Sequence, residues 1–181
     1  MQPRQTGGFT LVEVLVAMFV LAVGAVGAAA TQGGTVRLRE QAALESEAVQ
    51  LAASLAARMR VNRSQMALPD ASNPYLALDY DAAGGAPAPA PAQCFGAAAC
   101  DPAQLAGFDL YQAARAVASG FPGGRILVCR DSAAWNATLG ALDWSCAGGS
   151  GAPVVVKLGW RSRAAGAAGG ALPFVVLAVA P

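Results

Sequence analysis

Two groups of residues in this sequence could take part in chemistry: a single carboxylate, Glu13, and four cysteines. Glu13 lies inside an apolar run that covers residues 9–30. An acidic residue at the centre of a membrane-spanning helix costs roughly 2.5–3.5 kcal/mol on insertion scales. The nearest basic residues along the chain are Arg4 and Arg37, so no cation on the same helix can offset this cost. We therefore expect Glu13 to find its partner outside the helix.

The four cysteines are Cys94, Cys100, Cys129 and Cys146, separated by five, twenty-eight and sixteen residues. Zinc ligands usually come in close pairs, about two to four residues apart, and these gaps do not fit. An even number of cysteines behind a membrane-targeting segment is typical of disulfides in an oxidising compartment. Three pairings are possible. We favour Cys94–Cys100 with Cys129–Cys146, because each bond closes a short local loop.

The composition argues against catalysis and against a nucleic-acid partner. The 181 residues include no histidine, which excludes Ser-His-Asp and Cys-His catalysis and histidine metal ligands. We interpret Asp79, Asp81 and Asp131 as turn or solvent residues, because no motif joins them. The net charge is +1, and nothing in the sequence suggests a phosphate-binding surface. We therefore predict no enzyme, no catalytic residue, no metal site and no cofactor.

The first third of the chain predicts one long helix. Residues 9–30 would form about 33 Å of helix, which is enough to span a bilayer. The helical period continues beyond Thr31, where apolar residues recur three or four positions apart: Leu44, Ala48, Leu51, Ala52, Leu55 and Met59. We expect a single helix from about Phe9 to Asn62, amphipathic in its second half and with that apolar face in a core.

The middle of the chain predicts an irregular segment and then a short helix. Residues 69–93 have no regular pattern, and their Ala-Pro alternation favours an extended backbone. Asp101 is a plausible N-cap, with Pro102 at the first helical position. We expect this helix to cover about residues 102–118 and to end near Gly120.

The C-terminal part predicts a small antiparallel sheet. Three segments have the composition of strands: 125–131, 153–163 and 172–180. The Gly/Ala-rich residues 164–170 would join the last two as a hairpin with a loose loop. The amphipathic half of the long helix is the natural cover for the apolar face of this sheet. The predicted fold class is therefore α+β, with a long N-terminal helix packed on a small antiparallel β-sheet.

Three ordinary interpretations apply to residues 1–30. A secretory signal peptide has a shorter apolar core and a more basic start, although GAAA at residues 27–30 has the form of a cleavage site. A plain membrane anchor explains the length of the apolar run but not Glu13. A buried core helix explains neither the length nor the position.

The segment GGFTLVEVLVA, residues 7–17, resembles the prepilin leader and N-methylation segment of type IV pilins and type II secretion pseudopilins. In these families a dedicated peptidase cuts after the glycine, and the new N-terminal amine is methylated. The resemblance implies cleavage between Gly8 and Phe9 and methylation of Phe9. It also implies that Glu13, fifth in the mature chain, neutralises the amine of a neighbouring subunit during fibre assembly.

The resemblance also implies a division of the chain and a cellular location. The parts are a leader peptide (1–8), a transmembrane and assembly helix (9–30), its amphipathic continuation (31–63) and an exported globular domain (64–181). The chain would be a single-pass protein of the bacterial inner membrane, with its C-terminal domain in the periplasm, before it enters a pilus fibre at the cell surface. The implied partners are prepilin peptidase, other minor and major pilins, the inner-membrane assembly platform and membrane lipid.

Four further segments resemble PilV, a minor pilin family described as a type IV pilus modification protein: LAASLAARMRVN, CDPAQLAGFDLYQ, GGRILVCRD and VVVKLGW. This resemblance implies a minor subunit that helps to start or cap the fibre, and so acts in twitching motility and adhesion. One alternative is a minor pseudopilin of a type II secretion system, which the leader does not distinguish. Another is a binding module at the fibre tip.

Overall fold

The computed structural model describes residues 8, 10–96, 98–161 and 172–179. The chain forms two compact units, Met1–Ala42 and Ala43–Pro181. Helix α1 (Leu11–Val61) contributes to both units. Its bounds agree with the single helix expected from about Phe9 to Asn62, and each unit is described in turn below.

In the first unit, the start of α1 is apolar on every side apart from Glu13. The segment Leu11–Ala29 has a mean hydropathy of 2.5, and none of its side chains is buried. Leu11, Phe19 and Leu21 are 77%, 69% and 73% exposed. A helix that is apolar on every side is stable only when a membrane or other protein surrounds it. This segment is long and apolar enough to cross a bilayer.

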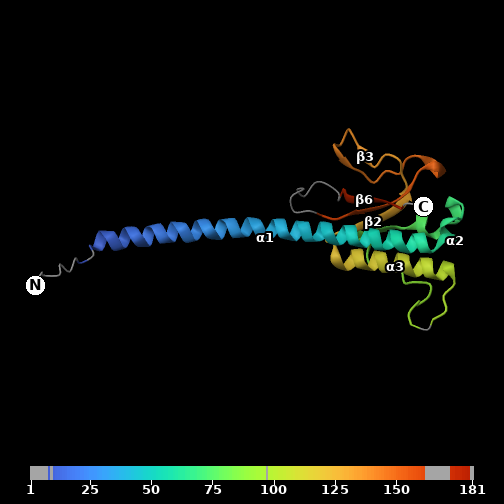
Figure 1. Ribbon diagram of the computed structural model, residues 1–181, viewed down its shortest axis with the longest axis horizontal. Helices are drawn as coiled ribbons and strands as arrows, with labels where there is room; N and C mark the ends of the chain where they lie inside the picture. Colours follow the sequence, from blue (N-terminus) through green and yellow to red (C-terminus); the bar gives the residue numbers. More distant parts are fainter. Residues whose placement is uncertain (1–7, 9, 97, 162–171, 180–181) are drawn as a thin grey trace, which may run out of the picture. The chain divides into compact units, whose positions relative to one another are not determined.

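In the second unit, the last part of α1 lies beside α3 (Pro102–Gly120), and the two helices run antiparallel (Figure 1). The Nδ2 atom of Asn62 donates a 2.8 Å hydrogen bond to the carbonyl of Pro102, so the end of α1 meets the start of α3. At the opposite end of α3, Gly120 faces the carboxylate of Glu47. A four-residue helix, α2 (Arg63–Met66), follows α1 directly.

Helix α3 begins as its sequence predicts. Asp101 Oδ1 accepts a 2.8 Å bond from the N–H of Gln104, and Gln104 Oε1 accepts a 3.0 Å bond from the N–H of Asp101. This reciprocal capping box satisfies backbone N–H groups that the helix itself cannot bond. Pro102 stands at the first helical position, where its missing N–H costs nothing. The predicted helix near residues 102–118 is confirmed.

The main sheet has four antiparallel strands in the order β1-β2-β5-β6. They are β1 (Asp79–Asp81), β2 (Arg125–Arg130), β5 (Val154–Gly159) and β6 (Pro173–Val179). A separate hairpin contains β3 (Trp135–Asn136) and β4 (Ala141–Leu142). A strand is present in each of the three predicted segments, although the one predicted over 153–163 ends at Gly159, and the fold is α+β. The loop expected at 164–170 lies outside the described residues.

Strand β1 falls in the segment 69–93, which we predicted to be irregular throughout; that prediction is wrong at these three residues. Asp79–Asp81 becomes a strand only because it pairs with β2, from which it is separated by 43 residues of the chain. The described residues also include four short 3₁₀ helices: η1 (Asp70–Ser72), η2 (Pro74–Ala77), η3 (Ala82–Gly84) and η4 (Gly149–Gly151).

The core of the second unit lies between the two helices and one face of the sheet. From α1 it receives Ala48, Ala52, Leu55, Ala56 and Met59, and from the sheet region Ile126, Val128, Val154, Val156, Leu158 and Trp160. The predicted apolar face of the long helix is therefore confirmed as core. Strand β5 is buried at all six positions, so its opposite face is covered as well.

Candidate functional site

Glu13 lies in the first turn of α1, where the helix start is capped by Thr10. The N–H of Glu13 donates to the Thr10 carbonyl at 3.1 Å and to Thr10 Oγ1 at 3.4 Å. Thr10 and Glu13 have the three-residue spacing of a capping box. A carboxylate in the first turn also gains typically 0.3–1 kcal/mol from the helix dipole. The sequence argument missed this local stabilisation, which the pattern T-x-x-E could have revealed.

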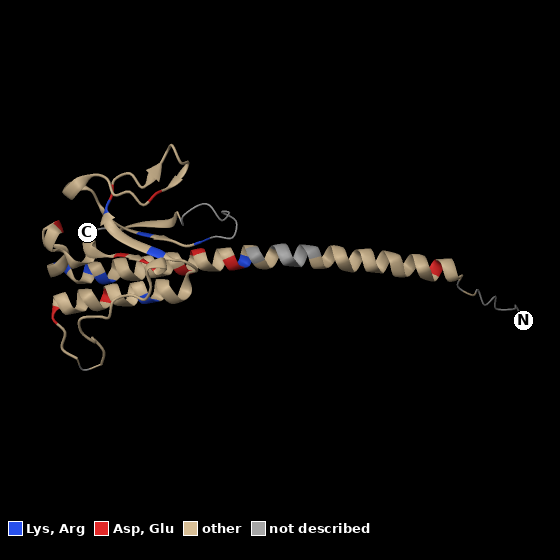
Figure 2. Ribbon diagram, turned by 180° about the vertical axis from the view of Figure 1, so that it is seen from behind, with Lys and Arg blue, Asp and Glu red and all other residues tan. Residues whose placement is uncertain are grey.

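The helix dipole does not remove the need for a cation. Glu13 is the only charged residue between Arg4 and Arg37, and Figure 2 shows that no charged residue is coloured in the part of α1 that directly follows it. Among the described residues, the Glu13 carboxylate has no ion-pair partner. A gain of 0.3–1 kcal/mol is smaller than the roughly 2.5–3.5 kcal/mol that an acidic residue costs inside a bilayer. Most of this cost is left for an interaction outside the chain.

The expected cleavage junction is only partly described. Gly8 is exposed and has no regular secondary structure, and a Cβ at its position would meet nothing within 4 Å. Phe9 lies outside the described residues. Gly8 itself is thus exposed two positions before Thr10, the residue that caps the start of α1.

The globular unit contains two disulfides, Cys94–Cys100 and Cys129–Cys146. This is the pairing favoured from the sequence. The first closes a loop just before α3, where the Phe95 ring meets Phe108 edge-on at a centroid distance of 4.7 Å. The second joins β2 to the segment after β4. Both bonds fit a domain that folds in an oxidising compartment.

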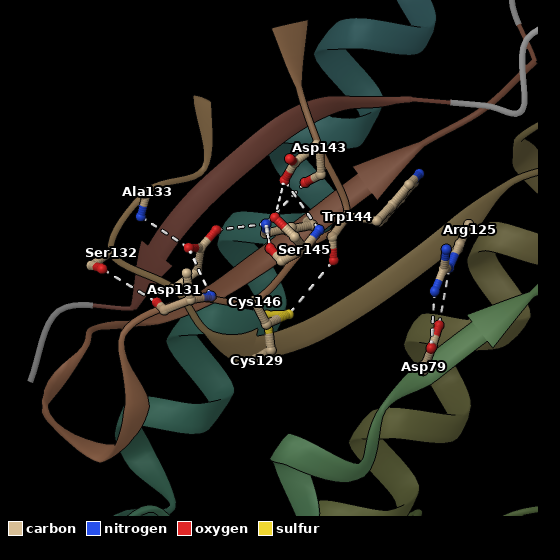
Figure 3. Close-up of a disulfide and its surroundings, with 12 residues drawn as sticks. Asp79, Arg125, Cys129, Asp131, Ser132, Ala133, Asp143, Trp144, Ser145 and Cys146 are labelled. Carbon is tan, nitrogen blue, oxygen red and sulfur yellow. Dashed lines mark hydrogen bonds and ion pairs between the residues drawn. A yellow bond between two sulfur atoms is a disulfide. The ribbon is translucent and has the colours of Figure 1, made fainter. Parts of the chain in front are cut away.

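Next to the second disulfide, Lys157 and Asp131 form an ion pair at 2.6 Å, with both side chains fully buried (Figure 3). The Lys157 ammonium also donates to the carbonyls of Asp143, at 2.9 Å, and Ser145. The other oxygen of Asp131 accepts bonds from two backbone N–H groups, those of Ala133 and Ala147. The buried Lys157 of β5 therefore contacts the segment that follows β2 at three residues, Asp131, Asp143 and Ser145.

The electrostatics of this pair follow from its contacts. Burial alone would raise the pKa of Asp131, but the bond from Lys157 and the two backbone bonds outweigh it, so the pKa lies below its ordinary value. The pKa of Asp143 is lowered by bonds from the Ser145 hydroxyl and the Asn136 amide. Asp131 is buried, so it is not a solvent residue, but its bond from the N–H of Ala133, two positions on, fits the turn residue that we also considered. Its partner Lys157 lies on another strand, which a single sequence does not reveal.

A second polar network joins α1, η2 and α3. Arg58 donates to Asp109 Oδ1 at 3.0 Å and to the side chain of Gln112. Tyr75, fully buried, donates its hydroxyl to Asp109 Oδ2 at 3.1 Å and accepts a bond from Asn62. Burial is the main reason that the pKa of Tyr75 lies well above its ordinary value. The network fixes α3 against the end of α1.

The remaining aspartates of interest lie at the edge of the sheet. Asp79 is about half exposed and accepts two bonds from Arg125, at 2.9 and 3.0 Å. Asp81 caps η3 by accepting a 2.8 Å bond from the N–H of Ala83. Figure 3 shows Arg125 beside Trp144, whose ring centroid is 4.7 Å away. In the described part of the chain, no cluster of three histidine, cysteine or acidic side chains could hold a metal ion.

The start of the chain matches a known family model. Residues 3–29 match the prokaryotic N-terminal methylation motif, a segment that includes Gly8, Glu13 and most of the apolar stretch. No curated protein and no solved structure gives a significant match. The motif supports a type IV pilin-like or pseudopilin protein. A leader of this kind implies processing by prepilin peptidase and assembly with other pilins.

Proposed function

We propose that this protein is a minor type IV pilin that helps to start or cap the type IV pilus of a bacterium. One observation carries the proposal: a methylation motif over residues 3–29 leads into a helix segment whose apolar side chains are all exposed. Such a segment needs a bilayer before assembly and a bundle of similar helices afterwards. The four segments that resemble PilV favour a minor subunit of the pilus.

The N-terminal amine of a neighbouring subunit supplies the cation that Glu13 lacks within its own chain. Cleavage between Gly8 and Phe9 frees a cationic amine at the start of the mature helix, and methylation modifies that amine. Within a fibre, the Phe9 amine of one subunit and the Glu13 carboxylate of its neighbour neutralise one another in a dry interface. Removing one member of such a pair leaves an uncompensated buried charge, which costs roughly 3–5 kcal/mol.

The rest of the chain fits the same role. The mature protein consists of an assembly helix (9–30), its amphipathic continuation (31–63) and a globular domain (64–181). The domain lies in the periplasm before assembly, where its disulfides persist, and on the fibre surface afterwards. We propose a structural role without catalysis, and we assign no substrate or cofactor.

A minor pseudopilin of a type II secretion system is the alternative. The methylation motif is common to both classes of protein, and only the PilV-like segments favour the pilus. Deleting the whole chain separates the two roles. Loss of pili and twitching with normal export of folded enzymes supports the pilin; normal pili with failed export supports the pseudopilin.

Substitution at Glu13 tests the assembly role itself. We expect Glu13→Ala to insert into membrane at least as well as the wild type, because an intramembrane charge is removed. Its recovery in sheared pili should nevertheless fall by about tenfold or more, since each 1.4 kcal/mol is a factor of ten. Glu13→Gln keeps the size of the side chain and isolates the effect of charge. Val14→Ala is the matched control for a change of shape on the same turn.

Two outcomes decide the test. If Glu13→Ala enters fibres like the wild type, the role of this carboxylate is refuted. If both Glu13 variants fail to enter fibres while Val14→Ala enters them normally, the role of its charge is supported. The mass of the mature chain must be measured in each strain, so that a defect in cleavage is not mistaken for a defect in assembly.

A further inference from the structure

The two edges of the main sheet are protected to different degrees. Strand β1 forms one edge and has only three residues, of which Asp79 and Asp81 are charged. Asp79 is also held by Arg125 from the neighbouring strand. A short, charged strand is a common way to prevent a sheet edge from pairing with another chain. The β1 edge is therefore closed to strand addition.

Strand β6 forms the other edge and has none of these features. It has seven residues, Pro173–Val179, and none of them is charged. Its proline stands at the first position, where it does not interrupt the strand. Ala178 is exposed and Phe174 is 37% exposed. Within the described part of the chain, no strand pairs with the outer edge of β6.

A long, uncharged edge strand presents a row of backbone N–H and C=O groups to any extended chain. The pairing of β5 with β6 is irregular near Gly159, so the regular part of the edge is Val175–Val179. Val175, Leu177 and Val179 face the core, and they would continue the apolar layer into an added strand. Natural sheets usually protect such an edge unless a partner covers it.

We propose that the outer edge of β6 receives an extended, uncharged β-strand from a different protein chain. The added strand runs antiparallel to β6 and has apolar residues at alternate positions. Backbone bonds supply the affinity, and the row next to Val175, Leu177 and Val179 supplies the preference for apolar side chains. This mode of recognition needs no charged contact, which agrees with the composition of β6.

A second copy of this chain is a poor occupant. Pairing β6 with β6 of another copy through a two-fold axis would reverse the direction of α1 in that copy. Under the proposed function, on which this step alone rests, the α1 helices of a fibre all run in the same direction. The β1 strand of a second copy is too short and would bring Asp79 and Asp81 against an apolar strand. The partner is therefore another protein.

Peptide binding tests the proposal without fibres or Glu13. The full chain is placed in lipid nanodiscs, and the probe is a fluorescent peptide that alternates valine and threonine between terminal lysines. A second peptide has the same sequence, with alternate backbone nitrogens methylated along the pairing edge. We expect the first peptide to bind and the second to bind about tenfold more weakly or worse, because several backbone bonds are lost.

Two variants locate the site. Ala178→Lys places a charge on the β6 edge and should weaken binding of the first peptide by about tenfold. Ala118→Lys places the same charge at an exposed position of α3 and should leave binding unchanged. Equal affinity for the two peptides, equal effects of the two variants, or no binding would overturn the proposal. Dimers of the full chain that Ala178→Lys abolishes would show a second copy as the occupant and would also overturn it.

Discussion

The two units of this chain handle charge in opposite ways. In Ala43–Pro181, Arg58, Arg130 and Lys157 each bond to a carboxylate of the same unit, and the apolar side chains form a core. In Met1–Ala42, the described apolar side chains of Leu11–Ala29 are exposed, and Glu13 has no ion-pair partner among the described residues. In Ala43–Pro181 these three charges are therefore neutralised within the chain. Met1–Ala42 requires other molecules, and this is the physical content of the proposed function.

The largest effect on the globular unit is expected at its buried ion pair. Lys157→Met leaves the Asp131 carboxylate buried without its cation, and this should lower the free energy of unfolding by roughly 3–5 kcal/mol. Adding Asp131→Asn removes the uncompensated charge, so the double variant should recover a large part of the loss. Denaturant unfolding of the full chain in detergent measures both. A single variant as stable as the wild type would show that the pair contributes nothing.

The same pair predicts a dependence on pH. In the folded wild type the pKa of Asp131 lies below its ordinary value. Its contribution to stability is therefore present above the unfolded pKa, about 3.9, and is lost as the pH falls through the folded value. In Lys157→Met the buried carboxylate can accept a proton, so acidification should narrow the gap between variant and wild type. Unfolding curves from pH 7 to pH 3 test this, and a constant gap would contradict it.

Removing the disulfide beside that pair should cost about 2–5 kcal/mol, the usual loss in a small exported domain. We expect this loss of stability in the double variant Cys129→Ala with Cys146→Ala. Without the bond, the residues between positions 129 and 146 are no longer closed into a loop in the unfolded chain. The corresponding change at Cys94 and Cys100 releases a shorter loop and should cost less. Thermal unfolding of the two double variants gives the comparison, and the reverse order would contradict the loop-length argument.

The loss of a helix cap should have a smaller effect on stability, and this effect should differ between the two units. Each unit contains one capped helix start, at Thr10 and at Asp101. Asp101→Ala removes the cap of α3 and should lower the free energy of unfolding of the globular unit by about 1 kcal/mol. Thr10→Ala removes the cap of α1 and should leave this transition unchanged. Denaturant unfolding of both variants is the measurement. An equal loss in both would show that the first unit contributes to the fold of the second.

The sequence was sufficient where structure depends on local pattern. The apolar period of α1, the Asp101-Pro102 start of α3 and the strand-like composition of residues 153–163 each predicted an element that the structure contains. These patterns depend on neighbours within one or two turns of helix or along one strand. The two disulfides also have the pairing that short loops favoured.

The sequence was insufficient where partners meet only in the folded chain. Strand β1 exists because β2 lies beside it, and Asp131 is buried because Lys157 reaches it from β5. The network of Tyr75 and Asp109 likewise joins an irregular segment to a helix. The residue type alone does not tell whether a polar side chain is paired in the core or faces water. Glu13 could be identified from the sequence because a single charge within an apolar run is unusual whatever its partner is.

The central claim is that the first unit becomes complete only after processing and assembly. The mass of the mature chain, measured from cells with active prepilin peptidase, tests it most directly. The account predicts a chain that begins at Phe9 and carries a methyl group on its terminal amine, because this cationic amine is the proposed partner of Glu13. A chain that still begins at Met1, or one cut near Ala30, would contradict it.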